Sequence, residues 1–229
     1  MSKREQITIT CPNCNNEHPF TMWSSINTVL DPEMKAAVKD RSAFLFECPS
    51  CGEKTYVDYG MLYHQMEDRI MIHYANTDEA VEEAYRIYTQ EDDSDKLGML
   101  QSMREEDYMI RIVRSQSEMR EKIDIFDAGL DDRIVEIIKL ICAVKYQEDH
   151  PDHKSVIVYY HRNAEENLVE VYDDDQFKGA MIVSDEFYES VQKAYLSNLP
   201  DMRKDGLFIN RQWAIKHLSS EKMEKETAT

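Results

Sequence analysis

Four cysteines in two C-P-x-C motifs are the residues of this chain with the most definite chemistry. Cys11 and Cys14 form the first motif, and Cys48 and Cys51 form the second. Two residues between paired cysteines let both sulfurs turn toward one ion while backbone N–H groups of the same tight turn point at the thiolates. Four thiolates fill the coordination sphere of zinc and leave no position open for water or substrate. We therefore expect one structural Zn²⁺ per chain, bound by these four cysteines.

The residues around each motif predict a zinc ribbon made from two hairpins. A strand-like run precedes each motif, at residues 6–10 and 43–47. Asn15 and Gly52 follow the second cysteine of their motifs, where the turn often needs a positive φ, and both residue types tolerate it. Between the motifs, Asp31 before Pro32 reads as a helix N-cap and predicts an inserted short helix over residues 32–40.

A redox dithiol is the alternative that the same motif allows. In thioredoxin-like folds a low-pKa cysteine of this kind stands at the start of a helix. Here both motifs follow strand-like runs, and residues 15–19, with their asparagines and proline, cannot readily continue a helix. The pattern favours zinc over a thiol redox function, and disulfides less than either.

Length and charge bound the class of protein. The chain has 229 residues, of which 42% are hydrophobic, and a formal net charge of −18, so it can bury a core and should repel phosphate backbones. Residues 1–25 contain no apolar signal core, which predicts a cytoplasmic protein without a membrane segment. Nucleic-acid binding through the ribbon stays an alternative. It requires that the basic side chains of the ribbon share one face, and these are Lys3, Arg4, Lys35, Lys39 and Arg41.

The remaining pattern predicts an α+β fold. The expected chain order is a zinc-ribbon-like antiparallel β part with a helical hairpin, then a small antiparallel α+β module. The ribbon spans residues 6–75, and the region through residue 149 adds strand 108–113 and the hairpin of helices 115–127 and 131–149. The second hairpin helix should face the core with Ile134, Ile137, Ile138, Ile141 and Val144, and Cys142 on it should be a small buried hydrophobe.

Residues 150–153 form the best internal boundary, because His-Pro-Asp-His breaks the helical pattern. The module at residues 150–218 should contain a three-strand meander, at residues 155–161, 167–172 and 180–183. Ser184 and Asn210 should cap two further helices. Residues 219–229 are polar and are predicted to form a flexible tail.

The sequence evidence for a catalytic site is weaker than the evidence for a metal site. Acidic runs could supply metal-dependent hydrolase or nuclease ligands, although a helix cap explains Asp131-Asp132 and a turn explains Asp173-Asp174-Asp175. Residues 91–95 lack EF-hand spacing. His18, His64 and His73 could approach the zinc, but four cysteines already complete its coordination. His150 and His153 could bind an adventitious ion, although a solvated turn accounts for them.

These motifs together resemble the bacterial CpXC domain family. The resemblance rests on the paired C-P-x-C motifs and on stretches 23–27, 62–64, 111–115, 121–123 and 129–133, and it covers residues 6 to about 145. It implies that Cys11, Cys14, Cys48 and Cys51 are the family's motif cysteines, and it implies no substrate. We expect a noncatalytic structural-zinc protein that meets a protein partner or a second copy, in a pathway that the sequence does not name.

Overall fold

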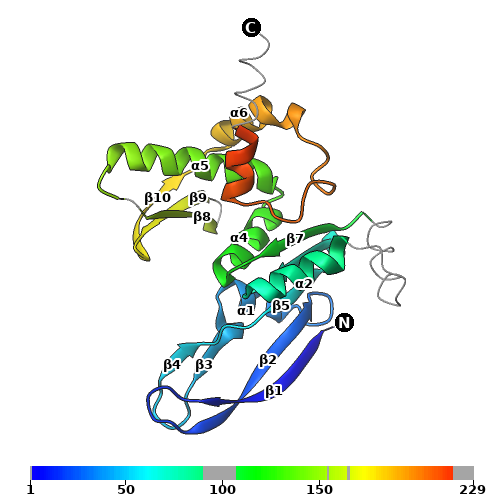
Figure 1. Ribbon diagram of the computed structural model, residues 1–229, viewed down its shortest axis with the longest axis vertical. Coiled ribbons are helices and arrows are strands. Elements are labelled where there is room, and N and C mark those ends of the chain that lie inside the picture. Colours follow the sequence, from blue (N-terminus) through cyan, green and yellow to red (C-terminus); the bar gives the residue numbers. More distant parts are fainter. Residues whose placement is uncertain (1, 90–106, 154, 164–165, 219–229) are drawn as a thin grey trace. The chain divides into compact units, whose positions relative to one another are not determined.

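The computed structural model describes residues 2–89, 107–153, 155–163 and 166–218. It has the expected α+β character and divides into two compact units, Met1–Arg120 (unit 1) and Glu121–Thr229 (unit 2). Figure 1 shows the elements of each. The predicted flexible tail at 219–229 and the acidic loop at 91–95 lie outside the described residues.

A five-stranded mixed sheet forms the body of unit 1, in the order β1-β2-β5-β6-β7. Its strands are β1 (Lys3–Thr10), β2 (Glu17–Asn27), β5 (Met61–Gln65), β6 (Ile70–Tyr74) and β7 (Met109–Val113). The pairs β1–β2 and β5–β6 are antiparallel, whereas β2–β5 and β6–β7 are parallel. Helix α2 (Asp78–Thr89) lies between β6 and β7 in the sequence, as a parallel pair requires a crossover.

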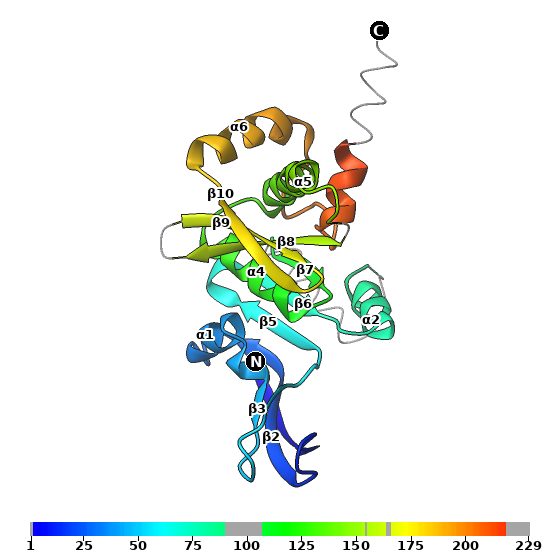
Figure 2. The same cartoon turned by 90° about the vertical axis from the view of Figure 1, so that its left-hand side faces the viewer.

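A second, two-stranded sheet carries the other C-P-x-C motif. It pairs β3 (Leu45–Glu47) with β4 (Lys54–Tyr56), and Figure 2 shows it beside the β1–β2 hairpin. Aromatic rings pack beneath the hairpins: Phe44 lies 5.0 Å from Tyr59, and Phe20 lies 6.1 Å from Tyr59 and 6.4 Å from Phe46 between centroids. These rings give the ribbon an apolar base.

The insertion between the motifs holds the predicted short helix, α1 (Glu33–Lys39). Its start differs from the prediction, because Pro32 takes the N-cap position and the cap has no side-chain hydrogen bond. A short 3-10 turn (Ser42–Phe44) then leads into β3, so the strand is shorter than the run at 43–47 suggested.

Helix α4 (Gln116–Asp127) begins at the predicted capping box. The Glu118 N–H donates to Ser115 Oγ at 3.1 Å, and the Arg114 N–H donates to the Glu118 carboxylate at 2.7 Å. Gly129, at φ 68°, ends the turn after this helix, and α5 (Asp132–Asp149) follows. The predicted helical hairpin is therefore present, and the division between units falls within α4.

Unit 2 contains an antiparallel meander in the order β10-β9-β8. Its strands are β8 (Val156–Asn163), β9 (Glu166–Asp173) and β10 (Gln176–Ile182), and α5 packs against β8 and β9. Helix α6 (Asp185–Tyr195) is capped by Ser184, whose Oγ accepts from the Phe187 N–H at 3.2 Å. Asn210 caps a last helical stretch at residues 211–218 through the Trp213 N–H.

The position of the division differs from the expected boundary at residues 150–153. Helix α5 contributes to the core beside β8 and β9, so it belongs with the meander rather than with the ribbon. Whether residues 150–218 fold by themselves stays a prediction. The predicted apolar stripe of α5 is wrong at its end, because Ile141 and Val144 are 37% and 48% exposed while Ile134, Ile137 and Ile138 are buried.

Candidate metal centre

The two C-P-x-C motifs form matching turns at the tips of the β1–β2 and β3–β4 hairpins. In the first turn, the Asn15 N–H donates to the Cys11 carbonyl at 3.0 Å; in the second, the Gly52 N–H donates to the Cys48 carbonyl at 2.8 Å. Asn15 and Gly52 have φ of 58° and 75°, as predicted. Each turn is followed by a strand, so neither motif enters a helix as a thioredoxin-like dithiol would.

The four sulfurs converge on one point. Cys11 Sγ lies 3.6 Å from Cys51 Sγ, Cys14 Sγ lies 3.6 Å from Cys48 Sγ, and all four lie within 4.8 Å of one another. Tetrahedral zinc with Zn–S bonds of about 2.3 Å places its sulfurs about 3.8 Å apart, whereas a disulfide needs about 2.05 Å. The cluster is therefore compatible with a metal ion bound by all four cysteines.

The electrostatics of the cluster favour a cation at its centre. The Cys14 N–H is directed at the Cys11 sulfur and lowers the pKa of that thiol to about 7. The Asn16 N–H acts in the same direction on Cys14, but partial burial and the three neighbouring sulfurs raise the pKa of Cys14 to about 12. Four thiolates so close together repel one another, and a divalent cation would remove that repulsion.

The variable residue of each motif reaches across to the opposite hairpin. Asn13 Nδ2 donates to Cys51 Sγ at 3.6 Å, and Ser50 Oγ lies 3.0 Å from His18 Nε2. Sequence reasoning missed these contacts, although their position inside the motifs could have suggested them. His18 therefore joins the two turns next to the sulfurs rather than replacing one of them.

The other candidate residues have different partners. His64 Nε2 lies 2.9 Å from the Tyr108 hydroxyl, and His73 Nδ1 lies 3.3 Å from the Tyr88 hydroxyl. Burial lowers the pKa of both imidazoles. Cys142 is buried as predicted, and burial raises the pKa of its thiol. In the described part of the chain, the four motif cysteines are the one group of His, Cys, Asp and Glu arranged to hold a metal.

The acidic runs are engaged in structural contacts. Asp131 caps α5, where it accepts from the Arg133 N–H at 3.0 Å and pairs with the Arg133 guanidinium at 2.6 Å. Asp173 pairs with His153 at 3.0 Å. Asp174 and Asp175, at φ 48° and 60°, make the tight turn between β9 and β10, as the turn interpretation of this run predicted.

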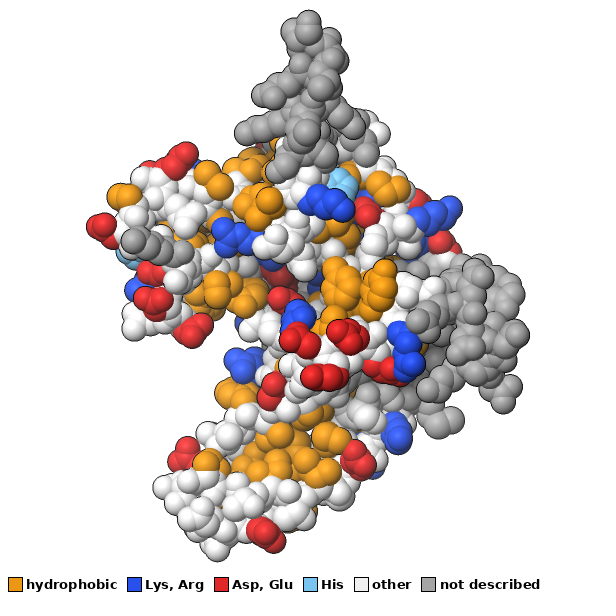
Figure 3. Space-filling model, in the orientation of Figure 1, with side chains coloured by type: hydrophobic (Ala, Val, Ile, Leu, Met, Phe, Trp, Pro, Cys, Tyr) orange, Lys and Arg blue, Asp and Glu red, His pale blue; other side chains and the backbone are white. Residues whose placement is uncertain are grey.

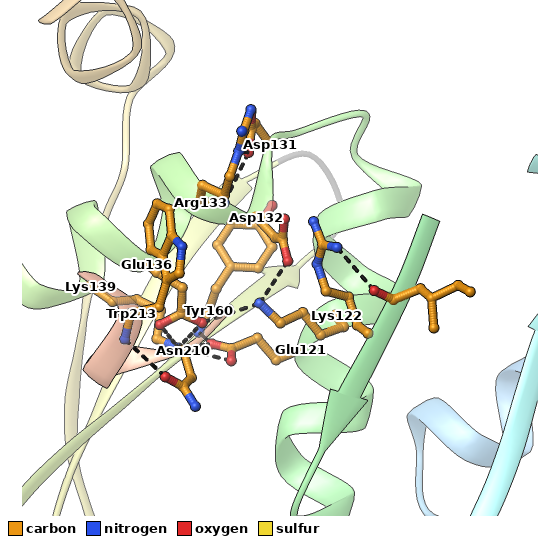
Figure 4. Close-up of polar contacts among 12 residues, drawn as sticks. Glu121, Lys122, Asp131, Asp132, Arg133, Glu136, Lys139, Tyr160, Asn210 and Trp213 are labelled. Atoms are coloured by element: carbon orange, nitrogen blue, oxygen red, sulfur yellow. Dashed lines mark hydrogen bonds and ion pairs between the residues drawn. The ribbon is translucent and has the colours of Figure 1, made fainter. Parts of the chain in front are cut away.

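Asp132 belongs to a series of buried charges that we call the buried ion chain, made of Glu121, Lys122, Asp132, Glu136 and Lys139 (Figure 4). Lys122 Nζ lies 3.0 Å from Asp132 and 3.3 Å from Glu136, and Lys139 Nζ lies 3.0 Å from Glu136 and 2.8 Å from Glu121. Glu121 also accepts from the Tyr160 N–H of β8. The chain therefore fastens α4 and α5 to the meander.

Two of the basic residues considered for nucleic acid lie over aromatic rings. The Arg4 guanidinium is 5.2 Å from the Trp23 ring centroid, and that of Arg41 is 4.2 Å from the Tyr56 centroid. Arg41 Nε also donates to Gln116 Oε1 at 3.3 Å. Within the described ranges, no helix has both the length and the apolar character of a membrane span.

Comparison with known proteins identifies a family. Neither the curated proteins nor the solved structures include a match to this chain. A family model described as CpXC protein matches residues 9–139, a range that contains all four motif cysteines and more than half of the chain. The chain therefore belongs to the CpXC protein family.

Proposed function

We propose that this protein is a noncatalytic interaction protein whose ribbon is held together by structural zinc. One observation carries the proposal: four cysteine sulfurs lie within 4.8 Å of one another at the tips of two hairpins. A metal bound by all four would join the β1–β2 and β3–β4 hairpins and would have no open position for a reacting group. Such a site stabilises a surface rather than performing a reaction.

Zinc fits the donor set best. Tetrahedral four-sulfur sites hold zinc or iron, and zinc does not require redox chemistry from the protein. The proposed site needs reduced cysteines, which supports the expected cytoplasmic location. With Zn²⁺ bound, Asn13 would donate to a thiolate, and the His18–Ser50 contact would keep the two turns together.

Metal content tests the zinc assignment. Protein purified without added metal should contain one zinc and no iron by plasma mass spectrometry, and four thiols should react only after chelation. Cys48→Ser should lose the zinc, whereas Cys142→Ser, which changes a buried cysteine outside the cluster, should keep it. Full zinc content in Cys48→Ser, or iron in the native protein, would contradict the assignment.

The proposed interaction role is supported by the surface. Figure 3 shows hydrophobic side chains gathered on unit 1 over the strands that lead to the cysteine turns. Val29 and Leu30, in the turn after β2, are 57% and 60% exposed. A contiguous apolar patch, rather than single exposed residues, is typical of a surface that meets another protein. The strong negative charge makes nucleic acid the less favoured partner.

A further inference from the structure

Strand β10 in unit 2 is an edge strand. In the described part of the chain it pairs with β9 alone, and its other side has no neighbouring strand. β8, at the opposite edge, has its Tyr160 N–H bonded to the buried carboxylate of Glu121. The two edges of the meander therefore differ, because one is anchored by a side chain and the other is open to pairing.

The ladder shows which backbone groups of β10 face outward. The Val183 N–H donates to the Asn167 carbonyl at 2.8 Å, so residue 183 occupies a hydrogen-bonded position. Antiparallel pairs alternate between hydrogen-bonded and non-bonded positions. Ile182 and Ala180, which lie opposite Leu168 and Glu170, occupy the non-bonded positions. Their N–H and C=O groups point away from β9, toward the place of a further strand.

The side chains of β10 present an apolar surface next to that edge. Phe177, Ala180 and Ile182 share one face because their partners alternate along β9. Phe177 and Ile182 are 58% and 67% exposed, and the Tyr172 ring lies 5.7 Å from that of Phe177. In Figure 3, hydrophobic side chains lie at the surface over this sheet, with acidic ones beside them.

Both ends of the strand are acidic. Asp174 and Asp175 are exposed in the turn before β10, and Asp185 and Glu186 are exposed in the first turn of α6, just after it. Within β10 the one ionised side chain is Lys178, which donates to Gln176 Oε1 at 3.2 Å. A strand added here would meet an apolar centre and negative charge at each end.

We propose that the open edge of β10 binds an extended segment of a partner protein that has alternating apolar residues and a lysine or arginine at each end. The segment would add a fourth strand to the meander by β-augmentation. This inference rests on the proposed interaction role and names the class of partner. It does not depend on the zinc assignment.

Charge argues against a second copy as the occupant. Antiparallel self-pairing of β10 would place the Asp174–Asp175 end of one copy beside the Asp185–Glu186 end of the other, and parallel pairing would place identical acidic ends together. Like charges directly opposite each other destabilise a strand pair. A basic-ended strand instead finds opposite charge at both ends.

Fluorescence anisotropy with synthetic peptides tests the inference on the full-length, zinc-loaded protein. The probe is a labelled peptide of alternating valine and threonine with two lysines at each end. We expect it to bind, and a version with glutamates at the ends to bind roughly tenfold more weakly. A third peptide keeps the lysines and carries N-methyl groups on alternate amides. It should not bind, because main-chain pairing requires those donors.

Variants of the protein locate the site. Ala180→Pro removes an outward N–H and should abolish binding, while the zinc content and Trp213 fluorescence show that the fold is retained. Asp174→Asn with Asp185→Asn should weaken binding roughly threefold for each charge. The matched control, Glu148→Gln with Asp149→Asn, changes exposed acids at the end of α5 and should leave binding unchanged.

Several results would overturn the inference. They are absence of binding, equal binding of the glutamate peptide, and binding that survives N-methylation or Ala180→Pro. Sedimentation that shows a dimer lost in Ala180→Pro would identify a second copy as the occupant instead. Any of these results with zinc still bound would leave the metal assignment in place, whereas failure of the metal test would leave the peptide result unaffected.

Discussion

Unit 1 brings four cysteine sulfurs together at the ends of two hairpins, whereas unit 2 buries ammonium and carboxylate groups between helices and a sheet. In unit 1 the β3–β4 hairpin has short strands, aromatic rings form an apolar base beneath both hairpins, and the proposed zinc would connect their tips. In unit 2 the buried ion chain connects α4, α5 and β8 directly through side chains. The first arrangement would depend on a bound metal ion, whereas the second contains its own charges.

This difference means that the two units should respond to different perturbations. A chelator removes a metal but leaves ion pairs intact, while a charge deletion in unit 2 has no direct effect on the cysteines. The chain has two tryptophans, Trp23 in unit 1 and Trp213 in unit 2. Trp213→Phe therefore leaves a reporter of unit 1, and Trp23→Phe leaves a reporter of unit 2.

Chelation should have the largest effect. Structural zinc has an apparent binding free energy of about 10–16 kcal/mol near neutral pH, much of which appears as folding free energy. We expect a strong chelator to shift Trp23 emission and to increase amide exchange in β1 to β4, while Trp213 emission and exchange in α5 stay as they were. Equal changes in both reporters would show that the units do not unfold separately, and no change in either would exclude a stabilising metal.

Lys139→Met should be the most damaging change within unit 2. It leaves Glu121 and Glu136 buried without the ammonium that pairs with both, and a broken buried pair costs about 3–5 kcal/mol. Urea unfolding followed by Trp213 should show the loss, with zinc content unchanged. Lys145→Met, at an exposed position of the same helix, is the control and should change stability little. Similar stabilities of the two variants would mean that the buried ion chain is not needed.

The next largest effect should be the dependence of the stability of unit 2 on pH. Burial raises the pKa of Glu121 from 4.5 to about 7, although Lys139 opposes this shift. Between these values the folded protein keeps a proton that the unfolded chain has lost, so stability should fall as pH rises across the window. Glu121→Gln should remove this slope in Trp213-monitored urea unfolding. The native slope persisting in that variant would contradict the assignment to Glu121.

The ribbon could be predicted from the sequence because its rules are local. The spacing of Cys11 and Cys14, repeated at Cys48 and Cys51, determines the turns, and the positive φ of Asn15 and Gly52 follows from residue type. The convergence of the four sulfurs was also expected from the donor set, and the structure brings them together. The cap residues Ser115, Asp131, Ser184 and Asn210 were found for the same reason, since each acts within a few residues.

Long-range features could not be predicted in this way. Lysine and glutamate side chains are normally exposed to solvent, and no local signal shows that Lys122 and Glu136 are buried in one chain of ion pairs. The parallel pairing of β2 with β5 and of β6 with β7 depends on contacts across many residues. Ile141 and Val144 continue an apolar period, yet from Val144 onward no residue of α5 is buried, so the helix extends past its packing surface.

The smallest expected effect comes from replacing one glycine with a positive φ in each unit by alanine. Gly52 in unit 1 and Gly129 in unit 2 have φ of 75° and 68°, and an added Cβ would meet no atom within 4 Å at either position. Alanine therefore adds only the left-handed backbone cost, about 1–2 kcal/mol. For Gly52→Ala this cost should weaken zinc affinity roughly 5- to 30-fold in competition with a chromogenic chelator. Gly129→Ala should lower the Trp213-reported stability and leave zinc affinity unchanged.

Gly52→Asn completes the comparison, because Asn15 already adopts φ 58° at the matching position of the first turn. We expect its zinc affinity to stay close to that of the native protein. If asparagine weakened zinc as much as alanine does, the backbone angle would not be the cause, and the two turns would not be equivalent. If Gly129→Ala also weakened zinc, the separation of a metal-dependent unit 1 from an ion-paired unit 2 would fail at this position.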